Sequence, residues 1–161
     1  MFQVESYSDD REKGYQQLLQ QLEALIEGEP DITANLANAS ALLNQFLTDI
    51  NWVGFYLWKD EELVLGPFQG LPACIRIPYG KGVCGTAVEE KATMLVPNVN
   101  EFPGHIVCDA NSKSEIVIPL IVKDRVVAVL DIDSPQFNRF DEIDQLFLEK
   151  LARKLERCFL A

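Results

Sequence analysis

Four cysteines are the residues of this sequence best suited to chemistry: Cys74, Cys84, Cys108 and Cys158. A thiolate attacks electrophilic atoms, and an oxidised cysteine can be recovered by a second thiol and an external dithiol. Cys108 is the least expected of the four. It opens the polar, turn-forming segment CDANSKSE, whereas an unpaired cysteine is usually buried among apolar residues.

The cysteine spacing does not favour a metal site. Zinc sites usually contain closely spaced ligand pairs such as CxxC, and the sequence contains no CxxC. Cys74, Cys84, His105 and Cys108 could in principle bind zinc, but we expect no metal here. A chain of 161 residues can bury its core without disulfides, so structural disulfides are not required either.

Two acids stand in the apolar run VVAVLDIDS. If this run is a strand, alternation places Asp131 and Asp133 on one face together with Val127 and Val129. A strand that runs out into solvent would explain two acids equally well. Neighbouring residues must therefore decide between a site and an exposed strand end.

Glu115 begins the preceding apolar run and brings a third acid close. If the two runs form a hairpin at Lys123-Asp124, residues whose numbers sum to about 247 face each other. Glu115 then lies near Ile132 and its neighbours Asp131 and Asp133. Crowded carboxyls cannot all ionise cheaply, so one can keep a proton and act as an acid, and the group would attract an ammonium ion.

An aromatic strand offers a wall for a small molecule. Trp52, Gly54, Tyr56 and Trp58 alternate with apolar residues and share a face. The missing side chain at Gly54 predicts a gap between two rings, as in a pocket wall. The alternative is an aromatic core with a glycine bulge.

The elements expected to position these residues define the fold class. Periodicity predicts helices at 11–28, 32–48, 86–91 and from 141 onward, strands at 51–58, 63–68, 73–77, 94–97, 115–122 and 125–132, and a long loop at 98–114. Strands joined mostly by hairpins and flanked by helices indicate an α+β domain with an antiparallel sheet. Cys108 lies seven residues before Glu115, so the loop can carry its thiol over the acidic end of that sheet.

Composition excludes several functions. Apolar residues make up 48% of the chain and charged residues 24%, which is ordinary for a globular protein. The net charge of −11 disfavours nucleic acid. Neither a signal peptide nor an apolar run of about 20 residues is present, so we expect a cytoplasmic protein with no membrane partner.

Three segments, GKGVCGTAVEEKATMLVPNV, FPGHIVCDANSKSEIVIPL and VLDIDSPQFNRFDEID, resemble the free methionine-(R)-sulfoxide reductases, which are stand-alone GAF domains. The resemblance runs from about Asn51 to the end of the chain. It implies a single GAF domain over residues 1–161, with a central antiparallel sheet of about six strands and the N- and C-terminal helices packed on one face.

The resemblance also implies a role for each candidate residue. The substrate would be free L-methionine-(R)-sulfoxide, with Cys108 as nucleophile, Cys74 as the resolving thiol and Cys84 as a second resolving or substrate-proximal thiol. Glu115 or Asp133 would protonate the sulfoxide oxygen. The implied substrate pocket consists of an acidic group and an aromatic wall: Glu115, Asp131, Asp133, Trp52 and Tyr56.

The same resemblance implies the partners. No cofactor is expected beyond an external dithiol reductant, for which thioredoxin is the natural candidate, and a homodimer is suggested. His105, if protonated, would offset the acidic field around Cys108. The alternatives are a GAF sensor that binds a small ligand and a thiol redox sensor, both without turnover.

Overall fold

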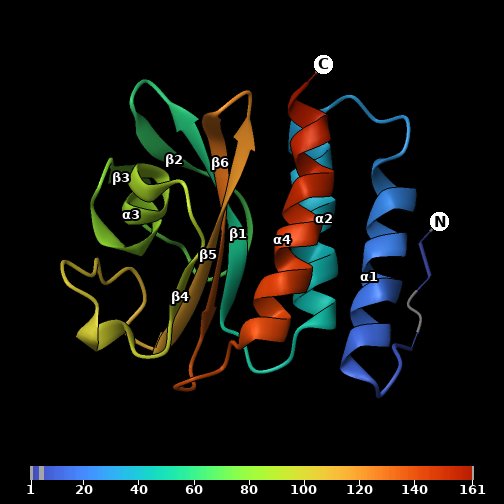
Figure 1. The fold of residues 1–161 in the computed structure, drawn as a ribbon, viewed down its shortest axis with the longest axis horizontal. Helices are drawn as coiled ribbons and strands as arrows, with labels where there is room; N and C mark the ends of the chain where they lie inside the picture. Colours follow the sequence, from blue (N-terminus) through green and yellow to red (C-terminus); the bar gives the residue numbers. More distant parts are fainter. Residues whose placement is uncertain (1, 4–5, 161) are drawn as a thin grey trace.

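The protein, seen in a computed structural model that describes residues 2–3 and 6–160, is built around one antiparallel sheet. The six strands lie in the order β3-β2-β1-β6-β5-β4 (Figure 1). The α+β architecture expected from the sequence is confirmed. Along the chain the elements are α1 Arg11–Ile26, α2 Ile32–Phe46, β1 Trp52–Lys59, β2 Glu62–Gly70, β3 Arg76–Pro78, α3 Gly82–Glu90, β4 Met94–Val96, the 3-10 helix η1 Val99–Glu101, β5 Ser114–Val122, β6 Arg125–Ser134, α4 Glu142–Glu156 and the 3-10 helix η2 Arg157–Phe159.

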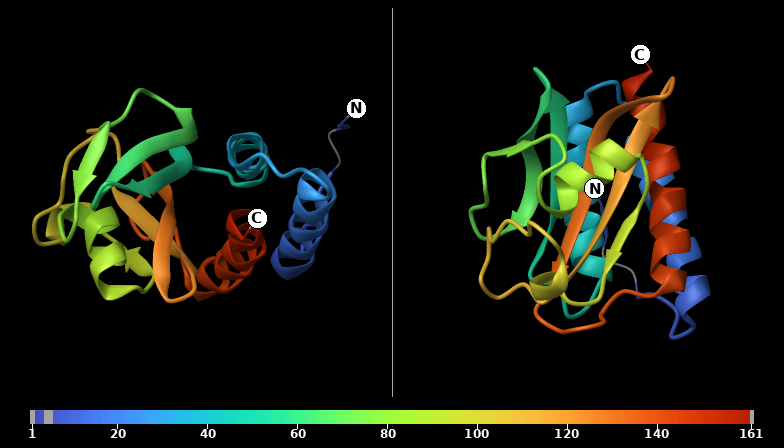
Figure 2. Two further views of the ribbon diagram at one scale, coloured as in Figure 1. Left: turned by 90° about the horizontal axis from the view of Figure 1, so that it is seen from above. Right: turned by 60° about the vertical axis from the view of Figure 1, so that its left-hand side comes forward.

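The sheet separates two hydrophobic clusters. Helices α2 and α4 cover one face with α1 outside them, and α3 lies on the opposite face (Figure 2). Alternation along β1 serves both faces, since Val53 and Phe55 join the helical cluster while Trp52 and Tyr56 join the cluster beneath α3. The two-sided strand predicted from the sequence is therefore present.

A buried carboxylate fastens α1 to α4. Asp144, which is almost fully buried, accepts hydrogen bonds from the Tyr15 hydroxyl at 2.6 Å and from Arg11 Nη2 at 2.9 Å. Asp141 caps the N-terminus of α4, as its position in the sequence predicts.

Among the residues that the structure describes, no helix is both long enough and apolar enough to cross a membrane.

The hairpin between β5 and β6 turns at the predicted residues. Lys123 and Asp124 have φ values of 52° and 64°, the left-handed pair that a two-residue turn of the twisted hairpin requires. Next to the turn, Val122 faces Arg125. The numbering here follows the expected sum of 247.

A β-bulge then changes the register of the same hairpin. Val127 is the extra residue, and beyond it Glu115 faces Asp133 rather than Ile132 as predicted. Val127 packs with the helical cluster, so it does not share a face with Val129 as simple alternation predicts. Because directly opposed residues lie on the same side of a sheet, the bulge is what puts Glu115 on the acidic face.

The gap predicted at Gly54 is absent. A Cβ added to Gly54 would lie 2.2 Å from the Cβ of Phe68, because β2 approaches closely where the register shifts between Gly54 and Tyr56. Phe68 instead stacks on Trp52, with ring centroids 5.1 Å apart. Gly54 therefore allows β1 and β2 to pack closely. This is the aromatic core with a glycine bulge that the sequence offered as the alternative to a pocket wall.

Candidate active site

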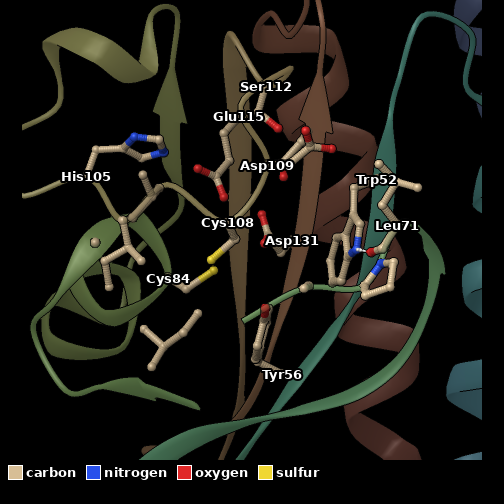
Figure 3. Close-up of a pocket in the computed structure, with 17 residues that line it drawn as sticks. Trp52, Tyr56, Leu71, Cys84, His105, Cys108, Asp109, Ser112, Glu115 and Asp131 are labelled. Carbon is tan, nitrogen blue, oxygen red and sulfur yellow. Dashed lines mark hydrogen bonds between the residues drawn. The ribbon is translucent and has the colours of Figure 1, made fainter. Parts of the chain in front are cut away.

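A pocket opens on the α3 side of the sheet and contains most of the predicted site residues (Figure 3). Its cavity of about 40 Å³ has room for a few water molecules. Strands β1, β5 and β6 form its floor, and α3 and two loops form its walls. The sequence-predicted residues that line it are Trp52, Tyr56, Cys84, His105, Cys108, Glu115, Asp131 and Asp133.

Two of the four cysteines form a disulfide at this pocket. Cys74 and Cys108 are bonded across 34 residues of sequence, with Cα atoms 5.5 Å apart. Cys84 and Cys158 carry free thiols. The structure therefore pairs the expected nucleophile with the expected resolving cysteine, and their assigned roles stay predictions.

The loop that carries Cys108 is fixed at its polar end. Asn51, just before β1, donates from Nδ2 to Asp109 Oδ2 at 2.9 Å and to Ser112 Oγ at 3.1 Å. The backbone N–H of Lys113 donates to the Ser134 carbonyl at 2.8 Å. The polar segment that made Cys108 look misplaced thus anchors the loop to β1 and β6.

The loop that carries Cys74 is fixed by the two aromatic residues of the pocket. The Tyr56 hydroxyl donates to the Cys74 carbonyl at 2.9 Å, and Trp52 Nε1 donates to the Leu71 carbonyl at 3.1 Å. The sequence predicted Trp52 and Tyr56 only as a substrate wall. Their polar atoms also hold the segment before β3, which begins at Arg76, later than predicted.

Replacing Tyr56 with phenylalanine keeps the ring and removes the hydroxyl that holds Cys74. We expect disulfide formation after a single turnover to slow about fivefold, as for the loss of about 1 kcal/mol of hydrogen bonding. Rapid quenching with an alkylating reagent measures the rate. Tyr79→Phe, which alters an exposed ring, is the control, and an unchanged rate in Tyr56→Phe would show that Cys74 needs no such anchor.

The three acids lie together, with Glu115 and Asp131 buried and Asp133 partly buried. Glu115 is 7% exposed and Asp131 6%. Burial raises the pKa of Glu115 well above its usual range, and the charges of Asp131 and Asp133 raise it further. Burial also raises the pKa of Asp133 well above its usual range. For Asp131 burial again raises the pKa, while interactions with Glu115 and Cys84 oppose the rise, so Asp131 is best suited to carry the negative charge.

Cys84 lies in the first turn of α3 and faces Asp131. The helix begins at Gly82, earlier than the predicted 86, and this start brings the Cys84 thiol to the pocket. Complete burial and the nearby acids raise its pKa well above the usual range, so it stays a thiol and is a poor nucleophile. Ligand atoms of Cys84, Glu115 and Asp131 lie within 4.8 Å of one another, close enough to surround a small cation.

His105 does not supply the positive charge considered in the sequence analysis. Burial lowers its pKa, although the charge of Asp131 opposes this. The imidazole is therefore mainly neutral at pH 7 and does not offset the acidic field.

Unpaired polar atoms mark where a ligand would bind. Among the described residues, the buried side-chain oxygens without a hydrogen-bond partner are Asn51 Oδ1, Asp131 Oδ1 and Asp133 Oδ1. All three belong to the pocket or to the loop anchor beside it. Opposite them, the amides of the first turn of α3 have no partner within the helix. The site therefore offers acceptors for a cation on one side and donors for an anion on the other.

Comparisons with known proteins agree with this chemistry. The GAF domain family matches residues 31–159. Protein YtsP of Bacillus subtilis is 59% identical over 98% of both chains. The free methionine-R-sulfoxide reductase of Escherichia coli is 54% identical, covering 89% of this chain and 87% of its own.

A solved structure extends the likeness to three dimensions. The free methionine-R-sulfoxide reductase from Neisseria meningitidis, crystallised in complex with its substrate, superposes with a TM-score of 0.94 at 44% identity, over 99% of this chain and 96% of that one. The chain thus belongs to the GAF domain family and, within it, to the free methionine-R-sulfoxide reductases.

Proposed function

We propose that the protein reduces free L-methionine-(R)-sulfoxide to L-methionine with Cys108 as the nucleophile. The observation that carries this assignment is the Cys74–Cys108 disulfide beside a pocket lined by three acids. A disulfide at that place is the expected product of one turnover. It joins the only pair of cysteines that the described residues bring into bonding distance.

The pocket can recognise both ends of a free amino acid. The ammonium group would bind the acids, where Asp131 Oδ1 and Asp133 Oδ1 lack partners. The carboxylate would accept hydrogen bonds from the first amides of α3, Gly82 to Cys84, which line the pocket. The S-methyl group would contact the stacked rings of Trp52 and Tyr56, whose centroids are 5.9 Å apart.

The chemical step moves one oxygen atom from substrate to enzyme. Glu115 or Asp133, protonated because burial raises the pKa of each, donates its proton to the sulfoxide oxygen as the Cys108 thiolate attacks sulfur. The hydroxyl then moves from the substrate sulfur to the Cys108 sulfur as the bond between the two sulfurs breaks, so that methionine leaves with its sulfur reduced by two electrons and Cys108 becomes a sulfenic acid. The substrate ammonium neutralises part of the acidic field during this step.

The enzyme is then restored by thiols. The Cys74 thiol attacks the Cys108 sulfenic acid, water leaves, and the observed disulfide forms. An external dithiol, which we expect to be thioredoxin, returns both cysteines to thiols and supplies the two electrons. Cys84 would remain a substrate-proximal thiol that donates toward Asp131. We further propose that no other cofactor or metal takes part and that residues 1–161 act as one GAF domain, in the cytoplasm and as a homodimer.

Incubation with racemic free methionine sulfoxide and dithiothreitol tests the assignment. Chromatography on a chiral phase should show loss of the R epimer alone, with one methionine formed per sulfoxide consumed. A Cys108→Ser protein, which keeps the pocket but lacks the nucleophile, should leave both epimers intact. Persistence of both epimers with the unaltered protein would favour a ligand-binding sensor instead.

A further inference from the structure

Three large apolar side chains close in sequence to the two half-cystines are exposed to solvent. Leu71, Ile75 and Val107, here called the collar, are 59%, 66% and 65% exposed. Each lies within three residues of Cys74 or Cys108 in the sequence. Among the described residues eight large apolar side chains are exposed, and the three of the collar are the most exposed of them, so their position next to the two half-cystines needs an explanation.

The backbone that carries two of these side chains is fixed by hydrogen bonds. The carbonyls of Leu71 and Cys74 accept the hydrogen bonds from β1 described above, and the carbonyl of Ile75 accepts one from the N–H of Leu65 at 2.8 Å. The segment is thus pinned to β1 and β2 by its carbonyls. Leu71 and Ile75 are exposed although their backbone is fixed.

The exposure of Val107 follows from the placement of its neighbour. Its neighbour Ile106 points inward, where its side chain lies 3.1 Å from the Cβ position of Gly82, and Ile106 lines the pocket while Val107 does not. The two half-cystines themselves are only partly buried. The collar residues therefore adjoin, in the chain, a disulfide that is itself partly exposed.

The two sulfurs of the disulfide have different surroundings. Cys108 lines the pocket and Cys74 does not, so the Cys74 sulfur lies on the side of the bond away from the acids. A thiolate arriving from outside attacks the Cys74 sulfur and expels the Cys108 sulfur toward the pocket. This order returns the nucleophile directly to its working position.

We infer that the collar is the docking surface for a dithiol protein of the thioredoxin class, which binds there to reduce Cys74–Cys108. The inference rests on the proposed function, because a disulfide produced at each turnover requires an external dithiol. A small dithiol gains little from exposed apolar side chains, whereas a protein partner buries them and gains hydrophobic free energy.

The reduction balances in electrons and protons. A thiolate of the partner forms a mixed disulfide with Cys74 as the Cys74–Cys108 bond breaks and Cys108 leaves as a thiolate. The second thiol of the partner then attacks the mixed disulfide and releases Cys74. The partner ends as a disulfide, having given two electrons and two protons to the two cysteines.

The double variant Ile75→Ser, Val107→Ser tests the collar without touching the pocket lining. We expect the kcat/KM for thioredoxin to fall at least about tenfold, since two apolar contacts are lost at docking. Turnover with dithiothreitol should stay unchanged. Leu146→Ser, at a comparably exposed apolar residue of α4, is the matched control and should leave both rates unchanged.

The other possible results distinguish failure of the docking surface from failure of the proposed function. Equal rates of variant and unaltered protein with thioredoxin would overturn the docking surface, as would an unaltered protein that dithiothreitol reduces and thioredoxin does not. A fall with both reductants would also overturn it. A double variant that loses a dimer in sedimentation would assign the collar to a second copy of this chain. Failure of the unaltered protein with every dithiol would instead refute the proposed function.

Discussion

Replacing Cys108 with serine should abolish turnover, with kcat at least about 10³-fold lower, because no other group can take the oxygen. The hydroxyl of serine is nearly isosteric, but it is a far weaker nucleophile than a thiolate and can form neither a sulfenic acid nor a disulfide. Cys84 cannot substitute, since its burial raises its pKa and keeps it protonated. Steady-state assays with dithiothreitol and L-methionine-(R)-sulfoxide measure the effect.

Two controls accompany this test: substrate binding by Cys108→Ser, and the activity of a protein in which a cysteine outside the pocket is replaced. Calorimetry should show that Cys108→Ser still binds the substrate, because the acids and the α3 amides are unchanged. Cys158→Ser, on η2 and outside the pocket, should retain full activity. Substantial turnover by Cys108→Ser would place the nucleophile elsewhere.

Replacing Glu115 with glutamine should have the second largest effect, lowering kcat by about 10²-fold or more through loss of a proton donor and an ammonium ligand. Asp133→Asn provides the comparison, and the larger loss identifies the donor. In the unaltered protein, turnover should decline toward alkaline pH as the raised-pKa carboxyls lose their protons. Near-normal turnover by both variants would exclude these two acids as donors.

Glu115→Gln should also become more stable relative to the unaltered protein as the pH rises. The pKa of Glu115 is higher in the folded protein than its unfolded value of about 4.3. The folded state therefore binds this proton more tightly, and the stabilisation, complete below the unfolded pKa, is lost as pH rises through the folded pKa. Glutamine does not ionise.

Denaturation at several pH values measures this difference. The unfolding free energy of Glu115→Gln relative to the unaltered protein should increase from pH 5 to pH 8. Glu61→Gln, on the exposed turn between β1 and β2, removes the same charge outside the pocket. A constant difference across that pH range would show that the pKa of Glu115 is not raised in the folded protein.

Much of the site could be read from the sequence because it depends on local periodicity. Alternation put Trp52 and Tyr56 on one face of β1 and Asp131 and Asp133 on one face of β6, and the pairing of the two strands brings these faces to the same side of the sheet. The left-handed pair at Lys123 and Asp124 fixed the hairpin. The position of Cys108 near Glu115 followed from chain continuity. These are short-range properties that no tertiary contact has to correct.

The rest depends on contacts between distant segments. No local signal shows that Val127 is bulged, although this single residue decides which face Glu115 occupies. The fit of Gly54 against Phe68 likewise arises only when β2 pairs with β1. The hydrogen bond from the Tyr56 hydroxyl to the Cys74 carbonyl joins residues that are 18 apart in the sequence. The aromatic ring of Tyr56 explained its place in the strand, so nothing in the sequence indicated this second role of the hydroxyl.

The order of events at sulfur is tested most directly by one turnover of a protein that cannot form the disulfide. Cys74→Ser, fully reduced and freed of thiols, would be mixed with excess L-methionine-(R)-sulfoxide and a sulfenic acid trap such as dimedone. We predict one methionine released per protein and one trapped group on Cys108 by peptide mass spectrometry. Methionine release with the trapped group on Cys84, or no release at all, would contradict nucleophilic attack by Cys108.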